Sequence, residues 1–321
     1  MLITSNHMPV LRSILAPEAL VSHVEAAYGL TITRVQLIKA ILLDTYRLWT
    51  NQGFYILRIY PNQRRTLSEI QAELDFVTYL HSQGAPVSIP VLQRAGERLL
   101  ILQAPEGTRY AVLFTYAHGE PLEENLTAIQ SYGYQLARIH ALADNLPFSL
   151  DRPALDLANL LDNPLTYLAH FRERQSDWAF LQQVVDIIRP QILALPTTPP
   201  HYGYCHGDAG GNNAHVDADG QVTFFDFDFC GLGWRAYDIG VFLNHESVAV
   251  TEAFLRGYQE VRALTAEEQA AIPLFQMAQT IWMLGLRARY INEWGEMYFT
   301  DRFIDYVLKE IKTTFESVQA R

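Results

Sequence analysis

The hydrophobic pattern of this chain changes near residue 116. Before that point the apolar residues gather in strand-like runs, whereas from Leu126 they recur at the three- and four-residue spacing of helices. A chain of 321 residues exceeds one average core, so we expect either two domains or two lobes that share a cleft. The sequence therefore predicts an α+β protein with a small antiparallel-sheet lobe at 1–116 and a larger, mainly helical lobe at 117–321.

Local signals define several elements of the first lobe. Two β-rich runs, LDTYRLW and FYILRIY, flank Gly53 within residues 43–60 and predict a hairpin. Thr66 and Glu69 form a capping-box pattern, which opens an amphipathic helix that ends at Gly84. The remaining elements expected here are a helix at 17–28 and strands at 98–102 and 109–116.

The acidic residues are concentrated in the second part of the chain. Residues 1–116 carry 10 Lys and Arg against 8 Asp and Glu, whereas residues 117–321 carry 14 against 27. A net charge of −11 leaves no basic surface to displace counterions from phosphates, so no nucleic-acid partner is expected. The acidic excess favours a cationic or amine-bearing partner, and it fits equally well a surface that only keeps the protein soluble.

No membrane association is expected. The first twenty residues lack a basic start followed by an apolar run, and no stretch of about 18 apolar residues occurs later. Cys205 and Cys230 are the only cysteines, and their spacing matches no metal motif, so we expect two buried thiols. These features predict a cytoplasmic protein, and nothing in the sequence indicates an oligomeric state.

Polar residues suited to chemistry are concentrated at 204–238. Within this segment Asp219-Gly220 is a dipeptide favoured at the centre of a type I′ hairpin turn. With that turn, Asn213 would lie opposite Asp226, and the Cβ atoms of directly opposite residues are about 5 Å apart. An amide oxygen and a carboxylate so placed suit Mg²⁺. The sequence therefore predicts a magnesium site at the open end of a hairpin.

The residues around this hairpin resemble a phosphotransferase signature. The triplet HGD at 206–208 precedes Asn213, and the triplet DFD at 226–228 follows, which resembles H-G-D-x-x-x-x-N…D-x-D. This signature is typical of the family of aminoglycoside phosphotransferases, choline kinases and type II homoserine kinases. The resemblance implies a protein-kinase-like two-lobe fold. It also implies transfer of the γ-phosphoryl group of ATP, with Mg²⁺, to a hydroxyl of an aminoglycoside, amino alcohol, homoserine or sugar-like molecule.

The resemblance implies roles for residues of the second lobe. Asp208 would be the base that accepts the proton of the attacking hydroxyl. Asn213 and Asp226 would hold Mg²⁺, and Asp228 would either support these ligands or reach a second Mg²⁺. Two further residues would hold the loop and the following helix around the site, namely His206 and Asp238.

The resemblance places the nucleotide site in the first lobe. Arg58 stands where the family has a phosphate-holding Lys or Arg on the third strand, although an exposed strand cation fits this position equally well. Glu73 would pair with Arg58 from the following helix, and Glu69 is the alternative partner. A hinge segment would receive adenine through its backbone, and its residues are Phe114, Thr115 and Tyr116.

The segment that should cover the phosphates departs from the family pattern. Between the first two strands the chain reads KAILLDTYR, with no glycine and with Asp44 in the place of an Asn. Glycines there let backbone N–H groups approach phosphate. The residues AILL at 40–43 therefore imply either a looser cover or a lobe that has lost ATP affinity. The first reading gives an active kinase, and the second gives a ligand-binding pseudokinase.

The acceptor is expected to be small. Few residues separate Asp228 from the next expected helix, so the long activation segment of a protein kinase does not fit, and a protein substrate is the less favoured alternative. Acidic residues could face an amine-bearing acceptor, and aromatic residues could stack on it, although a helical aromatic stripe also fits core packing. These residues are Glu246, Glu252, Glu260 and Glu293, and Trp282, Tyr290 and Trp294.

Overall fold

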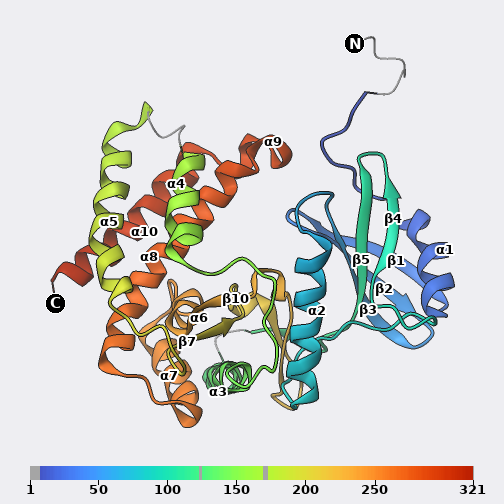
Figure 1. Ribbon diagram of the computed structural model, residues 1–321, viewed down its shortest axis with the longest axis horizontal. Coiled ribbons are helices and arrows are strands. Elements are labelled where there is room, and N and C mark those ends of the chain that lie inside the picture. The colour runs from blue at the N-terminus through green and yellow to red at the C-terminus, as the bar shows by residue number, and fades with distance from the viewer. Residues whose placement is uncertain (1–7, 123–124, 169–172, 321) are drawn as a thin grey trace. The chain divides into compact units, whose positions relative to one another are not determined.

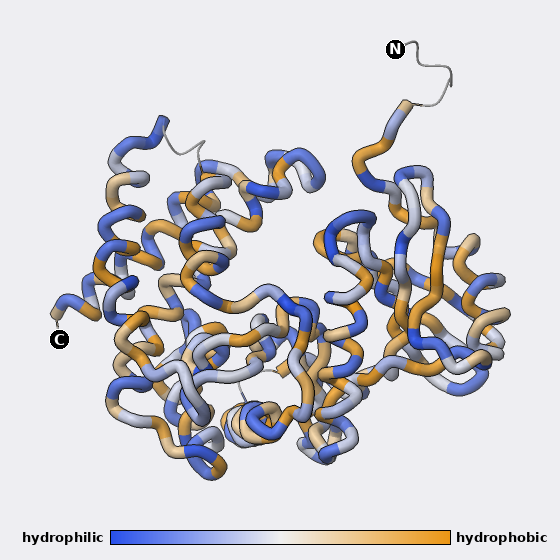
Figure 2. Tube along the Cα trace, viewed as in Figure 1, coloured by the Kyte–Doolittle hydropathy of each residue, from blue (hydrophilic) through white to orange (hydrophobic). Residues whose placement is uncertain are grey.

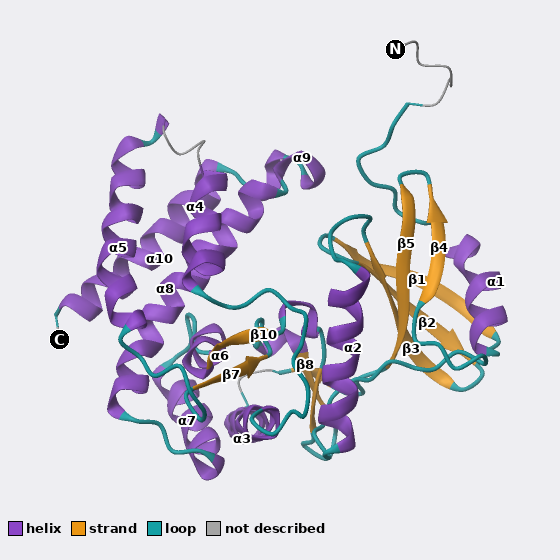
Figure 3. Ribbon diagram, viewed as in Figure 1, coloured by secondary structure: helices purple, strands orange, loops and turns teal. Residues whose placement is uncertain are grey.

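The computed structural model of the chain contains a strand-rich unit and a mainly helical unit, which confirms the predicted α+β class (Figures 1 and 3). The structure is described for residues 8–122, 125–168 and 173–320. The first unit comprises Met1–His81 and Ser88–Ala117, and the second comprises Ser82–Val87 and His118–Arg321.

A five-stranded antiparallel sheet, with the order β1-β2-β3-β5-β4, forms the centre of the first unit. Its strands are β1 (Ile32–Ala40), β2 (Asp44–Thr50), β3 (Gly53–Tyr60), β4 (Leu100–Ala104) and β5 (Gly107–Thr115). Its helices are α1 (Pro17–Tyr28) and α2 (Leu67–Ser82). The predicted hairpin is confirmed, because Thr50 pairs with Gly53 where β2 joins β3.

Alternation along β3 separates the two faces of this sheet. Leu57 and Ile59 are fully buried in a cluster with α1, where a side chain of this size contributes about 1.5–3 kcal/mol. Arg58 and Tyr60 point to the other face and contact Glu73 of α2. The sheet therefore has an apolar face covered by α1 and a second face with a polar group held by α2.

The second unit consists mainly of helices around α8, which contacts α4, α5, α6 and α10. Its helices are α3 (Leu126–Ala143), α4 (Asn163–Tyr167), α5 (Gln175–Leu193), α6 (Arg235–Phe242), α7 (Val248–Val261), α8 (Ala266–Arg289), α9 (Ile291–Trp294) and α10 (Asp301–Gln319). Polar and apolar residues alternate along α5, whose buried face joins the core (Figure 2). Within the described stretches, the helices are all too short or too polar to cross a membrane.

Two small antiparallel sheets carry the segment that precedes α6. Their strands are β6 (Glu120–Pro121), β7 (Tyr202–Cys205), β8 (Ala214–Val216), β9 (Val222–Phe224) and β10 (Gly231–Trp234). The strand β7 pairs with β10, and β8 lies between β6 and β9. The pairing of β7 with β10 brings the residues before and after the β8-β9 hairpin side by side.

The register of the β8-β9 hairpin differs by one residue from the predicted one. His215 pairs with Thr223, so the predicted pairing of Asn213 with Asp226 is wrong. Asn213 lies across from Phe225 instead, and the Phe225 N–H donates to the Asn213 carbonyl at 3.0 Å. Asn213 still precedes β8 and Asp226 still follows β9, so both remain at the open end of the hairpin.

The turn explains the shift in register. The carboxylate of Asp217 accepts hydrogen bonds from the backbone N–H groups of Asp219 and Gln221, at 2.9 and 2.8 Å. These bonds stabilise a longer connection with Gly220 in the left-handed region at φ 78°. A side chain that bonds to its own turn therefore overrides the two-residue turn that the Asp-Gly dipeptide favours.

Candidate active site

The loop that carries Asp208 is bound to α6 through its backbone. The N–H groups of His206 and Gly207 donate to the two carboxylate oxygens of Asp238 at 2.6 and 2.8 Å. Asp238 is fully buried. Burial alone would raise the pKa of Asp238, but hydrogen bonds from His140 and Gly207 lower it below its usual value. Charge-assisted bonds to one buried carboxylate therefore fix the orientation of this loop.

Gly207 allows the loop to approach the 3₁₀ turn Phe227–Phe229 closely. Its φ of 84° lies in the left-handed region, and an added Cβ would overlap the carbonyl oxygen of Phe229. Only glycine fits both conditions without displacement of the backbone. The middle residue of the HGD triplet is therefore required by local packing.

The ring of His206 connects this loop to the end of β9. Nε2 lies 3.0 Å from the carbonyl oxygen of Phe225, and Nδ1 lies 3.3 Å from the backbone nitrogen of Asp208. A carbonyl only accepts, so Nε2 carries the proton and Nδ1 accepts the Asp208 N–H. The ring also packs on Phe227, with 4.2 Å between ring centroids. His206 thus links the Asp208 loop to the residues around Asp226.

Asn213 is in direct contact with Asp208. Its amide nitrogen donates to the Asp208 carbonyl at 2.8 Å and to the Asp208 carboxylate at 2.7 Å. The amide oxygen Oδ1 accepts one long hydrogen bond, from the side chain of Asn212 at 3.4 Å. Because this oxygen carries two lone pairs, it is the atom of Asn213 that could bind a cation. The backbone loop 208–213 therefore holds a carboxylate and an amide side chain next to each other.

Asp226 has an unusual backbone conformation, with φ 65° and ψ 55°. Non-glycine residues seldom adopt this left-handed region, and such residues are concentrated at functional sites. Arg152 donates to the backbone carbonyl of Asp228, whose side chain is buried. Carboxylate and amide oxygens at one end of a hairpin are the donor set that Mg²⁺ prefers, so Asn213 and Asp226 fit this ion.

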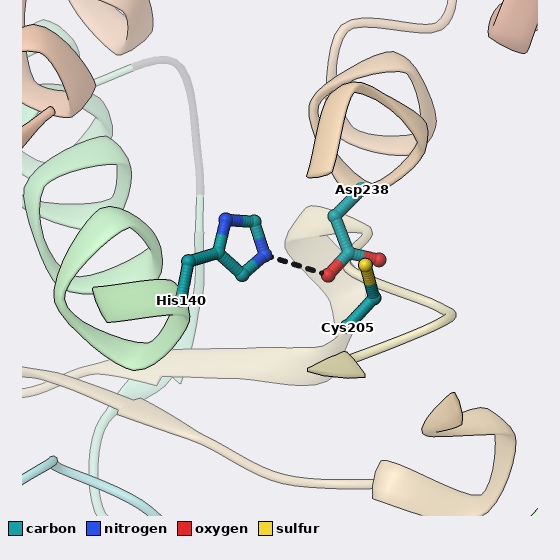
Figure 4. A group of neighbouring side chains, drawn as sticks. All are labelled: His140, Cys205 and Asp238. Atoms are coloured by element: carbon teal, nitrogen blue, oxygen red, sulfur yellow. Dashed lines mark hydrogen bonds and ion pairs between the residues drawn. The ribbon is translucent and has the colours of Figure 1, made fainter. Parts of the chain in front are cut away.

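A buried cluster of His140, Cys205 and Asp238 lies behind the loop (Figure 4). Nε2 of His140 is 3.0 Å from Asp238, and Nδ1 is 2.7 Å from the hydroxyl of Tyr258. Burial lowers the pKa of His140 to about 4, and burial raises the pKa of the Cys205 thiol well above its usual value. The imidazole and the thiol are therefore neutral, and their partners are already present, which argues against a metal in this cluster.

His140 was not predicted from the sequence. The feature of the sequence that could have revealed it is its place in the apolar stripe of α3, where one polar residue falls on a buried position. Both cysteines are buried free thiols, as predicted. The cluster therefore supports Asp238 from α3 and β7.

In the first unit, Arg58 pairs with Glu73. Nη1 of Arg58 lies 2.8 Å from the Glu73 carboxylate, and the hydroxyl of Tyr60 donates to the same carboxylate at 2.9 Å. Glu69 instead exchanges hydrogen bonds with Thr66 in the predicted capping box, at 2.7 and 3.1 Å. Of the two partners that the sequence left open for Arg58, the structure selects Glu73.

The expected hinge segment is partly engaged within the first unit. The N–H of Thr115 donates to the carbonyl of Ile89 at 2.9 Å, and the carbonyl of Thr115 accepts from the hydroxyl of Ser88 at 2.5 Å. The guanidinium of Arg58 lies 5.1 Å from the ring centroid of Phe114. The N–H of Thr115 is therefore occupied by neighbouring chain, whereas its carbonyl can accept a second hydrogen bond.

The connection between β1 and β2 is anchored from outside the hairpin. Asp44 is fully buried, with a carboxylate oxygen 2.6 Å from the equally buried Arg109. Arg12 also donates to Asp44 and to the carbonyl of Ile41. The Asp44 carboxylate therefore belongs to a buried ion-pair group, and Leu43 beside it is buried as well.

The residues considered for an acceptor are spread over several elements of the second unit. Trp282 packs edge-on against Phe229, 4.8 Å between ring centroids, and contributes to the core. Tyr290 stacks on Trp294 at 5.2 Å. The exposed acidic residues are Glu246 between α6 and α7, Glu252 and Glu260 on α7, and Glu293 on α9.

Comparison with known proteins agrees with this geometry. The model of the phosphotransferase enzyme family matches residues 35–271. The uncharacterized protein sll1119 of Synechocystis sp. is 35% identical over 299 residues, which cover 90% of this chain and 83% of that protein. The homoserine kinase of Bradyrhizobium diazoefficiens is 30% identical over 254 residues, which cover 75% and 74%.

A solved structure shows the same fold. Amicoumacin kinase hAmiN in complex with AMP-PNP, Ca²⁺ and Ami superposes with a TM-score of 0.76 at 21% identity, covering 92% of this chain and 93% of that one. The predicted protein-kinase-like fold is confirmed by this likeness and by the family match.

Proposed function

Because the chain belongs to the phosphotransferase enzyme family, we propose that it transfers the γ-phosphoryl group of ATP to a hydroxyl of a small molecule, with Mg²⁺. The observation that carries this proposal is the contact of Asn213 with the carboxylate of Asp208, at 2.7 Å. This contact orients the carboxylate and leaves Oδ1 of Asn213 for a cation. A base and a metal ligand are thereby held in one loop.

Each residue of the hairpin has a defined part in the proposed reaction. Asp208 accepts the proton of the attacking hydroxyl. The hydroxyl oxygen forms a bond to the γ-phosphorus, and the bond between the γ-phosphorus and the β-γ bridging oxygen breaks. Asn213 and Asp226 hold Mg²⁺, and Asp228 either supports them or reaches a second ion. When bound, Mg²⁺ neutralises charge on the phosphate oxygens. His206 and Asp238 hold the loop and do not react.

The nucleotide part of the proposal rests on Arg58. Its ion pair with Glu73, whose carboxylate also accepts a hydrogen bond from Tyr60, fixes a cation on the face of the sheet opposite α1. A fixed guanidinium suits a phosphate oxygen of ATP. Adenine would bind along the hinge residues 114–116, with the N–H of Thr115 excluded by its bond to Ile89.

The acceptor is proposed to be a small alcohol that carries an amine. The second unit contains the acidic excess of the chain, which favours a cation. Homoserine carries both a hydroxyl and an amine, and one relative is named as a homoserine kinase. An ATP-dependent reaction on such a molecule fits the cytoplasmic location predicted from the sequence.

A second candidate function is nucleotide or ligand binding without catalysis. The absence of glycine from residues 40–43 favours it, because fewer backbone N–H groups would reach the phosphates. The two functions differ in one observable property, since only an active kinase releases ADP when an acceptor is present.

An ADP-release screen tests the proposed function. Wild-type protein with ATP and Mg²⁺ is offered homoserine, choline, aminoglycosides and sugars in turn. We expect acceptor-dependent ADP release that Asp208→Asn abolishes and Asp219→Asn retains, because Asp219 lies on the exposed turn of the same hairpin. Equal release by the wild type and Asp208→Asn would contradict the assignment of the base.

A further inference from the structure

Residues 12–15, here called the N-terminal strap, are attached to the sheet of the first unit. The hydroxyl and the N–H of Ser13 donate to the Glu106 carboxylate at 2.8 and 3.3 Å. Arg109 donates to the carbonyl of Ser13 at 2.9 Å. Contacts from the β4-β5 turn and from β5 therefore fix the strap from two directions.

A further contact fixes the strap to β2. The hydroxyl of Tyr46 donates to the carbonyl of Leu15 at 2.6 Å. Tyr46 is fully buried and belongs to the cluster that α1 covers. The strap therefore lies on the α1 side of the sheet, on the opposite face from Arg58, so it cannot replace Arg58 as a phosphate ligand.

Arg12 extends from the strap to both ends of the β1-β2 connection. One guanidinium nitrogen donates to the carbonyl of Ile41, and the other donates to the carboxylate of Asp44. The Arg12 side chain is only 10% exposed. One side chain thus holds the backbone before Leu43 and the first residue of β2 after it.

Arg12 is not the only cation that compensates the charge of Asp44. Arg109 contacts the other oxygen of the Asp44 carboxylate at 2.6 Å, and both residues are fully buried. Loss of Arg12 would therefore leave a compensated ion pair in the core. The distinctive result of losing Arg12 is release of the connection 41–43, not collapse of the sheet.

A connection without glycine gains from being held in place. Ile41, Leu42 and Leu43 cannot give the close backbone approach of a glycine loop. Ordering a loose connection when a ligand binds reduces affinity, whereas a connection ordered during folding does not carry that cost at binding.

We propose that Arg12 is a positioning residue for ATP binding, because its side chain fixes the connection 41–43 before the nucleotide binds. The inference rests on the proposed function, because it takes this connection as the cover of the phosphates. It assigns the N-terminal strap, which lies outside the matched residues 35–271, to the nucleotide site. The effect of Arg12 should increase with the number of phosphates on the ligand.

Calorimetry with an unreactive ATP analogue plus Mg²⁺, and separately with adenosine, tests the inference. We expect Arg12→Ala to weaken binding of the analogue about tenfold while adenosine affinity stays within about twofold. Arg12→Lys keeps the charge, but a single ammonium bridges the Ile41 carbonyl and the Asp44 carboxylate poorly. We therefore expect its affinity for the analogue to fall about threefold. The matched control is Arg98→Ala, which removes another ion pair of the same unit, that with Asp75 at 2.6 Å.

The possible outcomes separate the inference from the proposed function. Unchanged affinity of Arg12→Ala for the analogue would overturn the inference, and so would an equal loss for adenosine and the analogue. If thermal melting shows that Arg12→Ala is unfolded, the ratio of the two affinities in Arg12→Lys decides by the same criterion. Absence of any nucleotide binding to the wild type would overturn the proposed function itself, and the inference with it.

Discussion

The Asp208 loop and the β1-β2 connection are held in place by different means. The loop is fixed through its own backbone, whose N–H groups bond to the buried carboxylate of Asp238. The connection is fixed by a distant side chain, Arg12, and contains no glycine. In the proposed function the Asp208 loop places reacting atoms, which admits few solutions, so its motif is intact. The proposed cover needs only a stable position over the phosphates, which a different set of residues can supply.

The largest expected effect concerns the Asp208 loop. Asp208→Asn removes the base but no phosphate contact, so we expect turnover to fall about a thousandfold, within the range for general-base catalysis. Nucleotide affinity should stay within a few fold. Steady-state kinetics and calorimetry on the same preparation measure both quantities. Turnover close to that of the wild type would show that this loop is not the catalytic one.

Two glycine substitutions, one in the Asp208 loop and one in an open turn, test how tightly this loop is packed. Gly207→Ala should lower the free energy of unfolding by about 3 kcal/mol, because the added Cβ overlaps the Phe229 carbonyl at a positive φ. Gly220→Ala has a similar φ of 78° with open space around the Cβ, so it should lose only about 1 kcal/mol. Urea denaturation measures both. Equal losses would mean that close packing does not restrict residue 207.

The buried His140 behind the Asp208 loop predicts that the free energy of unfolding depends on pH. The pKa of His140 is lowered to about 4 in the folded protein. Below pH 6.5, His140 therefore binds a proton in the unfolded chain but not in the folded protein. The free energy of unfolding should therefore decrease as the pH falls from 6.5 to 4, by up to about 3 kcal/mol from this residue.

Thermal melting across this pH range measures the effect. His140→Gln should lose less stability than the wild type between pH 6.5 and 4, whereas the control His23→Gln, on the exposed side of α1, should follow the wild type. Parallel curves for all three proteins would contradict a buried neutral His140.

The smallest expected effect concerns Arg58 in the first unit. Arg58→Ala should weaken ATP binding at least about tenfold, or about 1.4 kcal/mol, as expected for a charge-assisted phosphate contact. Arg58→Lys should retain more affinity, since an ammonium can still pair with Glu73. Calorimetry with the ATP analogue and Mg²⁺ decides the question. An unchanged dissociation constant in Arg58→Ala would remove this residue from the site.

The features that were predicted correctly depend on residues close together in sequence. The capping box at Thr66 and the hairpin at Gly53 are examples, because each is formed within a few residues. The hairpin register was wrong because Asp217 bonds to its own turn, which dipeptide preference does not include.

The contacts of Arg12 and His140 were not predicted because no local pattern encodes them. Arg12 reaches a carbonyl 29 positions later, and His140 reaches a carboxylate 98 positions later. Both residues hold segments of the proposed site in place without belonging to the motif. Their partners become apparent only when the fold brings distant parts of one unit together.

Phosphorus NMR of the wild type with ATP, Mg²⁺ and each acceptor that releases ADP tests the central claim most directly. The resonances distinguish ATP, ADP, inorganic phosphate and a phosphomonoester in one sample. We predict that ATP is replaced by equal amounts of ADP and a phosphomonoester of the acceptor, and that Asp208→Asn leaves ATP unchanged. ATP that stays intact with the whole acceptor panel, although it binds, or conversion to inorganic phosphate alone, would contradict a small-molecule kinase built on Asp208.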